Sequence, residues 1–288
     1  VSEVLISKIA EVYKKIRNTI RFILGNLNDF KYSDKVKYDD LPFIERYMLA
    51  RLYELHSLNT KNYSEYKFHI ICQNIFNFCN VDLSSFYLDI SKDILYCEKK
   101  DSQRRQAVQT VLFEILSVLL CDLAPILVFT TEEAASFYKE VLYNFDSTES
   151  IHLCSWLKLN DKYNNKNLID EFQLLNEIRE DILKAIEIER SKSIIGQALE
   201  AEVDIFVPEQ IFNKIFDKEE VIRRMVIVSK LKINKDDVNL MNIFKGEKVK
   251  VKVEKSKSNK CIRCWQYFEK LNNNNLCERC AEVVRTLL

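Results

Sequence analysis

Glycine and proline, the residues that interrupt regular secondary structure most strongly, are scarce in this chain. The 288 residues include 3 Gly and 3 Pro, about 2% of the chain where roughly 12% is ordinary. Both residue types mark turns and helix ends. Gly25, Gly196 and Gly246 also lie too far apart to form a glycine-rich phosphate loop. The sequence therefore predicts a mainly α-helical protein without a nucleotide-binding loop.

Length and charge set broad limits on the class of protein. At roughly 150 residues per domain, the length suits about two domains. Lysine and arginine together number 43, as do aspartate and glutamate, which excludes a histone-like polycation but allows local basic patches. The most apolar stretch, residues 111–129, is interrupted by Glu114, Asp122 and Pro125. We therefore expect no membrane span.

Helical periodicity dominates the first part of the chain. From Ser2 to Leu27, apolar residues recur mostly every three or four positions, which predicts an amphipathic helix. Similar patterns predict further helices over about 42–58, 62–79, 81–95 and 102–121. Residues 1–155 are therefore expected to form a helical domain. This pattern begins almost at residue 1 without an initiating Met, so we expect a piece of a larger protein.

The period changes after a long helix predicted at about 168–192. Apolar and polar residues alternate over 201–207 and 249–253, and a short apolar run covers Met225–Val228. These three segments are candidate strands. The sequence predicts a small α/β domain over residues 168–255, followed by a zinc ribbon over 256–288.

Paired cysteines give the strongest chemical signal. Cys261 and Cys264 form one C-x-x-C pair, and twelve residues later Cys277 and Cys280 form another. Two such pairs can close a tetrahedral shell of four sulfur atoms around Zn²⁺. A four-sulfur shell leaves no open position for substrate, so one structural zinc ion is predicted. The other cysteines are isolated, which is typical of a reducing compartment.

Positive charge surrounds these cysteines. Residues 245–263 carry a net charge of +6, which favours binding to nucleic-acid phosphates. Lys250, Lys252 and Arg263 are candidate phosphate contacts, although a solvated strand face is an equally simple interpretation of the lysines. Trp265 could stack on an unpaired base or pack against the cysteine loop.

A second polar face lies on the first predicted helix. Lys14, Arg17, Asn18 and Arg21 are spaced to share one face, opposite the apolar stripe. These four residues are candidate contacts for a nucleic acid, and a solvated helix face is the alternative. The histidines stand outside any catalytic motif and are expected to be structural.

Four segments resemble bacterial isoleucine-tRNA ligases, which are class I aminoacyl-tRNA synthetases. They are YKKIRNTIRFILGNLNDF at 13–30, SFYLDISKD at 85–93, LAPILVFT at 123–130 and KCIRCW at 260–265. The segments follow the order of the C-terminal part of that family. The resemblance implies a helical anticodon-binding domain, a tRNA partner, and a zinc finger whose ligands are the four terminal cysteines.

The resemblance also implies what the chain lacks. The two signatures with which the family binds ATP, His-Ile-Gly-His and Lys-Met-Ser-Lys-Ser, are absent. ATP binding is therefore expected only in a separate catalytic domain, and this chain alone is expected to be inactive. The implied partners are the catalytic and editing domains of the same protein, in a cytoplasmic monomer that does not bind membranes.

Two alternatives stay open at this point. The chain could be a stand-alone zinc-ribbon module that binds RNA or protein without enzymatic activity. A valine or leucine ligase is also not strictly excluded as the parent, although the terminal four-cysteine finger favours isoleucine. The sequence immediately before Val1 would distinguish a ligase from a stand-alone module.

Overall fold

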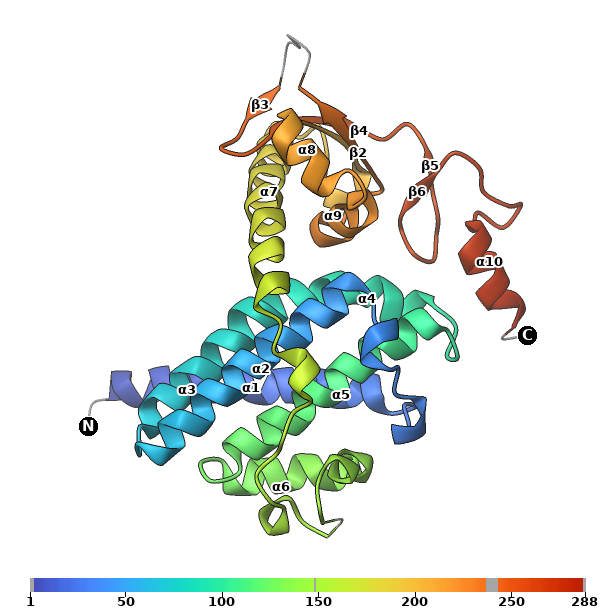
Figure 1. Cartoon of the computed structure of the whole chain (residues 1–288). Helices are drawn as coiled ribbons and strands as arrows, with labels where there is room; N and C mark the ends of the chain where they lie inside the picture. The colour runs from blue at the N-terminus through green and yellow to red at the C-terminus, as the bar shows by residue number, and fades with distance from the viewer. Residues whose placement is uncertain (1–2, 148, 237–242, 287–288) are drawn as a thin grey trace. The chain divides into compact units, whose positions relative to one another are not determined.

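The computed structural model describes residues 3–147, 149–236 and 243–286 (Figure 1). The chain divides into two compact units, Val1–Ile169 and Asp170–Leu288. Helices build the first unit, whereas the second combines helices, a small sheet and a cysteine-rich end. The predicted fold class is confirmed.

A buried helix, α5 (Gln103–Leu123), forms the centre of the first unit. Every side chain from Ala107 to Leu123 is buried, and α5 packs against four other helices, which are α1 (Glu3–Leu27), α2 (Phe43–Ser64), α4 (Leu88–Cys97) and α6 (Val128–Phe137). By length and composition α5 could cross a membrane, but 94% of its apolar window is buried inside the protein. Its apolar character is therefore that of a core helix.

The helical winding continues where the sequence predicts a break near residue 80. A π-helical segment, Phe78–Tyr87 (η3), joins α3 (Phe68–Asn77) directly to α4. The Ser84 hydroxyl donates a hydrogen bond of 2.7 Å to the carbonyl oxygen of Cys79, five residues earlier. That spacing matches the wider π-helical turn. The predicted separation of 62–79 from 81–95 is wrong, because the helical winding runs without interruption from α3 through η3 into α4.

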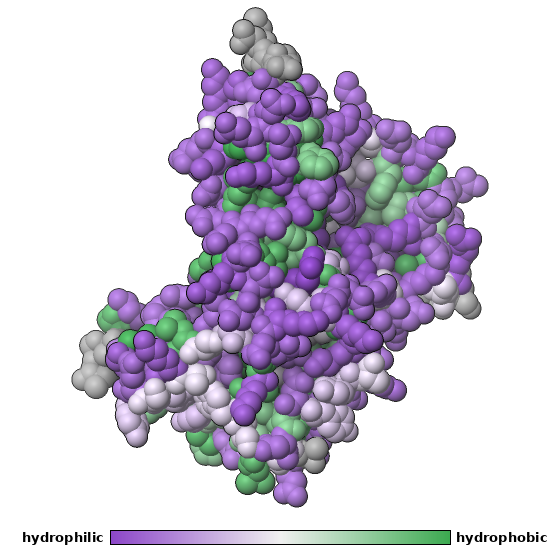
Figure 2. All heavy atoms as spheres, in the orientation of Figure 1, coloured by the Kyte–Doolittle hydropathy of each residue, from purple (hydrophilic) through white to green (hydrophobic). Residues whose placement is uncertain are grey.

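Short 3-10 turns connect the remaining parts of the first unit. They are η1 (Tyr32–Asp34), η2 (Tyr38–Asp40), η4 (Lys139–Asn144), η5 (Ile151–Leu153) and η6 (Asp161–Tyr163). The long helix α7 (Lys166–Ser191) follows, close to its predicted place. Figure 2 shows mostly hydrophilic residues on the visible face of α7.

A four-stranded sheet in the order β2-β1-β4-β3 organises the second unit. Strands β1 and β2 are parallel, whereas β1 with β4 and β3 with β4 are antiparallel. The elements of this part are η7 (Ala198–Glu200), β1 (Ala201–Val207), α8 (Glu209–Ile215), α9 (Glu219–Val226), β2 (Lys230–Lys235), β3 (Phe244–Lys245) and β4 (Lys250–Lys255). A parallel pair requires a crossover connection, which α8 and α9 provide.

The strand predicted at Met225–Val228 is wrong. Met225 and Val226 end α9, and Ile227 adopts a left-handed conformation (φ 57°) that terminates the helix. The strand β2 begins later, at Lys230. A short apolar run can lie on the buried side of a helix as well as in a strand, and Met225 and Val226 are both buried in this helix.

A buried carboxylate fixes the turn between β3 and β4. Asp181 of α7 accepts hydrogen bonds from the main-chain N–H groups of Lys248 (2.8 Å) and Val249 (3.3 Å). A Cβ atom at Gly246 would lie only 2.3 Å from Cγ of Asp181. Glycine is therefore required for this close approach, which orients the start of the lysine-rich strand β4.

Candidate metal centre and nucleic-acid surfaces

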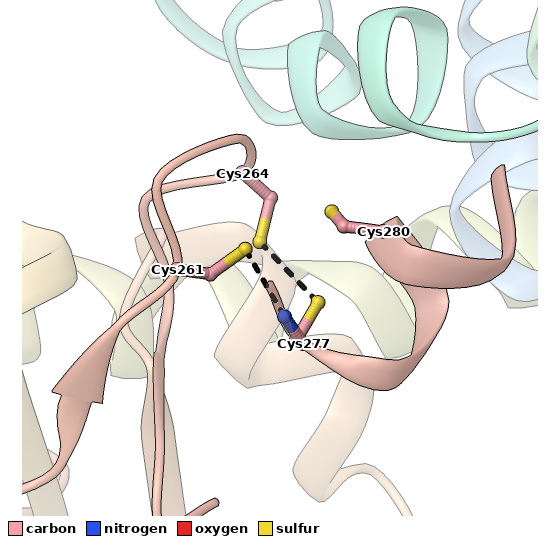
Figure 3. A group of neighbouring side chains, drawn as sticks. All are labelled: Cys261, Cys264, Cys277 and Cys280. Carbon is pink, nitrogen blue, oxygen red and sulfur yellow. Dashed lines mark hydrogen bonds between the residues drawn. The ribbon is translucent and has the colours of Figure 1, made fainter. Parts of the chain in front are cut away.

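Local turns bring the four terminal cysteines together. Cys261 and Cys264 lie on one loop between β5 (Asn259–Lys260) and β6 (Tyr267–Phe268), while Cys277 and Cys280 lie at the start of α10 (Glu278–Arg285). Their Sγ atoms lie within 4.8 Å of one another, and all four residues are buried. Figure 3 shows the side chains converging from the two segments. The structure thus assembles the predicted ligand set.

The sulfur geometry suits a tetrahedral zinc ion. With Zn–S bonds of about 2.3 Å, neighbouring sulfur atoms lie about 3.8 Å apart, and Sγ of Cys264 lies 3.9 Å from Sγ of Cys277. Nη1 of Arg263 lies 3.6 Å from Sγ of Cys280, so one predicted phosphate contact faces a candidate metal ligand. The guanidinium group of Arg263 thus donates a hydrogen bond to this sulfur.

Main-chain donors also favour ionisation at Cys261. Burial raises the pKa of this thiol, but the N–H groups of Cys264, Cys277 and Arg263 outweigh burial and lower the pKa to about 6. The main-chain N–H group of Cys277 donates a hydrogen bond of 3.4 Å to Sγ of Cys261. Because metals bind thiolates rather than thiols, this arrangement prepares the site for a cation.

Trp265 follows the second cysteine in a strained but solvent-facing position. Its φ is 64°, its side chain is 55% exposed, and its N–H group donates to the carbonyl oxygen of Cys261 at 2.9 Å. Nζ of Lys260 lies 5.6 Å from the centroid of the indole ring, within cation–π range. The ring is thus available for stacking rather than buried against the cysteine loop.

The cysteine-rich segment is joined to the sheet of its own unit through Ser229. The Ser229 hydroxyl donates to the carbonyl oxygen of Leu199 at 2.6 Å and accepts from the N–H group of Tyr267 at 2.9 Å. Ser256 adds a hydrogen bond to Glu202 of β1 at 2.7 Å. The segment is therefore held at Ser256, before its first cysteine pair, and at Tyr267, after that pair.

The lysines of β4 have carboxylate partners. Lys250 lies 2.8 Å from Asp236, and Lys252 lies 2.9 Å from Glu254. Two neighbours in the basic run are paired similarly, Lys248 with Glu177 and Lys255 with Glu200. The positive charge counted along the sequence is thus partly neutralised in the fold. Asp236 and Glu177 lie outside the basic run of residues 245–263, so a count of charge along that run does not include them.

The candidate residues of α1 lie differently, on an open polar face. Lys14, Arg17, Asn18 and Arg21 are all exposed. Among the residues that the structure describes, no carboxylate lies within ion-pair distance of Lys14, Arg17 or Arg21. Their charge is therefore available to an outside anion.

A groove of about 550 Å³ runs between α1 and α6 beside these arginines. Its lining includes Arg17, Arg21 and Asn28 on one side and Thr130 and Phe137 on the other. Phe137 is 74% exposed, so an aromatic ring and two guanidinium groups face the same space. Nothing in the local sequence of α6 marked Thr130 or Phe137 as site residues, because the groove exists only once α1 and α6 pack together.

Two families match the chain in this order. The anticodon-binding domain of tRNA ligase matches residues 45–205, and the zinc finger found in FPG and IleRS matches residues 258–283. The first match covers more than half of the chain and includes most of the helical unit. The chain belongs to the family of tRNA-ligase anticodon-binding domains.

Its named relatives are isoleucine–tRNA ligases. The protein of Caldicellulosiruptor bescii is 37% identical over 292 residues, covering 99% of this chain and 30% of the relative. The Oceanobacillus iheyensis isoleucine–tRNA ligase 1 and the Brachyspira hyodysenteriae isoleucine–tRNA ligase are each 38% identical, covering 99% of this chain and 31% of the relative. The resemblance stated from the sequence is confirmed, and the chain spans about 30% of its relatives' length.

Proposed function

We propose that this chain is the C-terminal tRNA-recognition part of an isoleucine–tRNA ligase, whose whole form attaches isoleucine to its tRNA using ATP. The observation that carries the proposal is the similarity to isoleucine–tRNA ligases across 99% of the chain. The anticodon-binding and zinc-finger matches in one chain add to it.

The groove between α1 and α6 supports a role in binding the anticodon region of tRNA. Arg17 and Arg21 place positive charge at its wall, where phosphate oxygens could be bound. Phe137 offers an exposed ring on which an unpaired base could stack. Lys14 and Asn18 extend the same polar face along α1 and complete the predicted contact set there.

The cysteine-rich end provides a second tRNA surface in this proposal. Trp265 offers a flat ring, with Lys260 beside it. Among the described residues, Lys257 and Lys260 have no carboxylate within ion-pair distance, so they are freer for phosphate than Lys250 and Lys252. Arg263 donates to Cys280 and lies two residues before Trp265 in the sequence.

One Zn²⁺ held by Cys261, Cys264, Cys277 and Cys280 would serve structure rather than catalysis. A bound zinc would cross-link the loop after β5 to the start of α10 and so fix the orientation of Trp265. With this role, residues 256–288 form the zinc finger, residues 168–255 the small α/β domain and residues 1–155 the anticodon-binding domain.

Catalysis would belong to other domains of the same protein. Adenylate formation needs groups that stabilise charge on the α-phosphate of ATP, and neither ATP signature of the family occurs here. We therefore assign ATP to the catalytic domain, place that domain and the editing domain among the partners, and expect a cytoplasmic monomer without membrane binding.

Two assays on the purified chain test this proposal. In filter binding, tRNA should bind with an affinity that falls as salt rises, and a fully paired RNA duplex of equal charge should bind more weakly. The chain alone should give no isoleucine-dependent exchange of pyrophosphate into ATP. Equal binding of duplex and tRNA would support the stand-alone module instead, and exchange above background would show a catalytic site in this chain.

A further inference from the structure

His56 of α2 ties the connection between η5 and η6 to the interior of the helical unit. Its Nδ1 atom lies 2.6 Å from Oδ1 of Asp122, and its Nε2 atom lies 2.9 Å from the carbonyl oxygen of Leu157. His56 is 6% exposed and Asp122 is fully buried. The imidazole ring thus bridges a carboxylate of α5 and the main chain of the connection.

This geometry fixes the number of protons that the site holds. A carbonyl oxygen only accepts, so Nε2 of His56 must carry a proton to bind Leu157. The contact between Nδ1 and Asp122 needs a second proton, because two acceptors 2.6 Å apart would repel each other. Oδ2 of Asp122 already accepts a hydrogen bond of 2.8 Å from Asn59. The His56–Asp122 pair therefore retains two protons while both bonds exist.

The surroundings of the pair favour the protonated state. Burial alone lowers the pKa of His56, but the hydrogen bond and charge of Asp122 and the bond to Leu157 outweigh burial and raise the pKa above 6.5. Burial also raises the pKa of Asp122. The other titratable groups near the pair are Tyr63 of α2, Cys72 of α3, and Cys121 of α5 with Cys154 of the connection.

We propose that His56 is a proton-dependent latch: when the pair loses a proton, the ring keeps Asp122 and releases the Leu157 carbonyl. A neutral imidazole has a single N–H group. Asp122 has no access to water and would be left as a buried charge without its partner, which is very unfavourable. The bond to the uncharged Leu157 carbonyl is the longer of the two, 2.9 Å against 2.6 Å to the carboxylate, and bonds to neutral acceptors are the weaker ones, so this bond is the one that breaks.

Trp156 makes the release measurable. Its indole ring stacks on the imidazole of His56, with centroids 5.5 Å apart and an interplanar angle of 14°. Its Nε1 atom donates to Oγ1 of Thr60 at 2.9 Å. Because Trp156 directly precedes Leu157, release of the carbonyl should disturb the stacking.

The sign of the pH dependence follows from the raised pKa of His56. A histidine whose folded pKa lies above its unfolded value stabilises the fold below the unfolded pKa, and this stabilisation disappears as pH rises through the folded pKa. The connection should therefore be held below the unfolded pKa of His56 and loosened as pH rises through its raised folded pKa.

Fluorescence of Trp156 tests the latch. The chain has two tryptophans, so Trp265→Phe leaves Trp156 as the only tryptophan, and excitation at the red edge of indole absorption avoids the tyrosines. A stacked imidazolium quenches indole emission, so emission should rise along a single-proton titration with a midpoint above pH 6.5. The rise should disappear when His56→Gln is added, whereas His69→Gln, a change at an exposed histidine, should leave the titration unchanged.

Two further measurements make the test independent of how the variants fold. Nitrogen NMR of the unaltered chain should show both ring nitrogens of His56 protonated at pH 6. Tryptic cleavage after Lys158, divided by the cleavage rate of a small peptide, should accelerate about tenfold above the midpoint, as loss of one hydrogen bond allows. A neutral His56 ring at pH 6, or a Trp156 titration that persists in His56→Gln, would overturn the proposal.

Discussion

The guanidinium group of Arg105 binds both carboxylate oxygens of Asp29, with each Nη atom 3.0 Å from one oxygen. Arg105 is 8% exposed, and its Nε atom donates to the carbonyl oxygen of Leu95 at 3.1 Å. Gln109 adds a hydrogen bond to Asp29 at 3.0 Å. One carboxylate thereby joins the turn after α1 to α5, and through Arg105 to α4.

Replacing this carboxylate should destabilise the helical unit in a pH-dependent way. Burial raises the pKa of Asp29, but the hydrogen bonds from Arg105 and Gln109 and the charge of Arg105 outweigh burial and hold this pKa below 3.8. Asp29→Asn should lower the free energy of unfolding by about 2 kcal/mol at pH 7. Stability from a depressed carboxyl pKa is lost as pH falls through the folded pKa, so urea unfolding should show the two chains converging below about pH 4. A difference in the free energy of unfolding between the unaltered chain and Asp29→Asn that stays constant down to about pH 2.5 would contradict this account.

Gly246 should tolerate no side chain. Gly246→Ala places a methyl group against Asp181, which must shift and lose its bonds to the hairpin, so the second unit should lose about 1–3 kcal/mol. Gly25→Ala is the matched control, since no atom lies within 4 Å of its Cβ position. In a helix it should stabilise the chain by up to about 1 kcal/mol. Thermal unfolding of both variants measures the contrast, and similar effects at the two glycines would refute the steric explanation.

Zinc content should depend on the terminal cysteines alone. Protein purified without chelator should contain about one zinc per chain, as four thiolate ligands allow, and Cys277→Ala should abolish binding. Cys72→Ala, which removes a half-buried thiol of the helical unit, should leave the metal content unchanged. A chelator should unfold the segment after about residue 258 and leave the helical unit folded. Metal analysis and circular dichroism report these outcomes, and a helical signal that is lost with the metal would show that the two parts fold together.

The two predicted phosphate-binding surfaces should differ in how strongly their substitution weakens the salt dependence of tRNA binding, because only the lysines of β4 are already ion-paired. Arg17→Ala with Arg21→Ala should reduce the slope of log affinity for tRNA against log salt by about 1.4–1.8, at 0.7–0.9 per phosphate contact. Lys250→Ala with Lys252→Ala should reduce it by less than about 1, because these lysines already bind Asp236 and Glu254. The affinities for tRNA should be measured between about 50 and 200 mM salt, where binding to phosphates changes strongly with salt. They show which pair of substitutions reduces the slope more. The opposite order would assign the main phosphate contacts to β4.

Sequence predicted the features that depend on neighbours along the chain. The cysteine pairs lie on short local turns, so their spacing was enough to predict the cluster around Cys261 and Cys277. The stripe along α1 was likewise a local pattern: Ile16, Ile20, Ile23 and Leu27 are buried as it required, whereas Ile9, in the first part of the helix, is 61% exposed.

Features that depend on distant contacts could not be predicted in this way. Asp236 and Glu177 form ion pairs with lysines that lie far from them in the sequence. Phe137 and Arg17 line the same groove only because α6 packs beside α1. The end of α9 was mistaken for a strand because a four-residue apolar run carries no period of its own.

Anticodon dependence of binding tests the central claim most directly. The measurement is the affinity of the chain for a stem–loop carrying the isoleucine anticodon, compared with the same RNA in which the three anticodon bases are replaced. If the chain recognises those bases by stacking and hydrogen bonding, each contact contributes about 1–3 kcal/mol, and the altered RNA should bind at least about tenfold more weakly at the same salt concentration. Equal affinity for both RNAs would contradict anticodon recognition and leave only nonspecific attraction to phosphate.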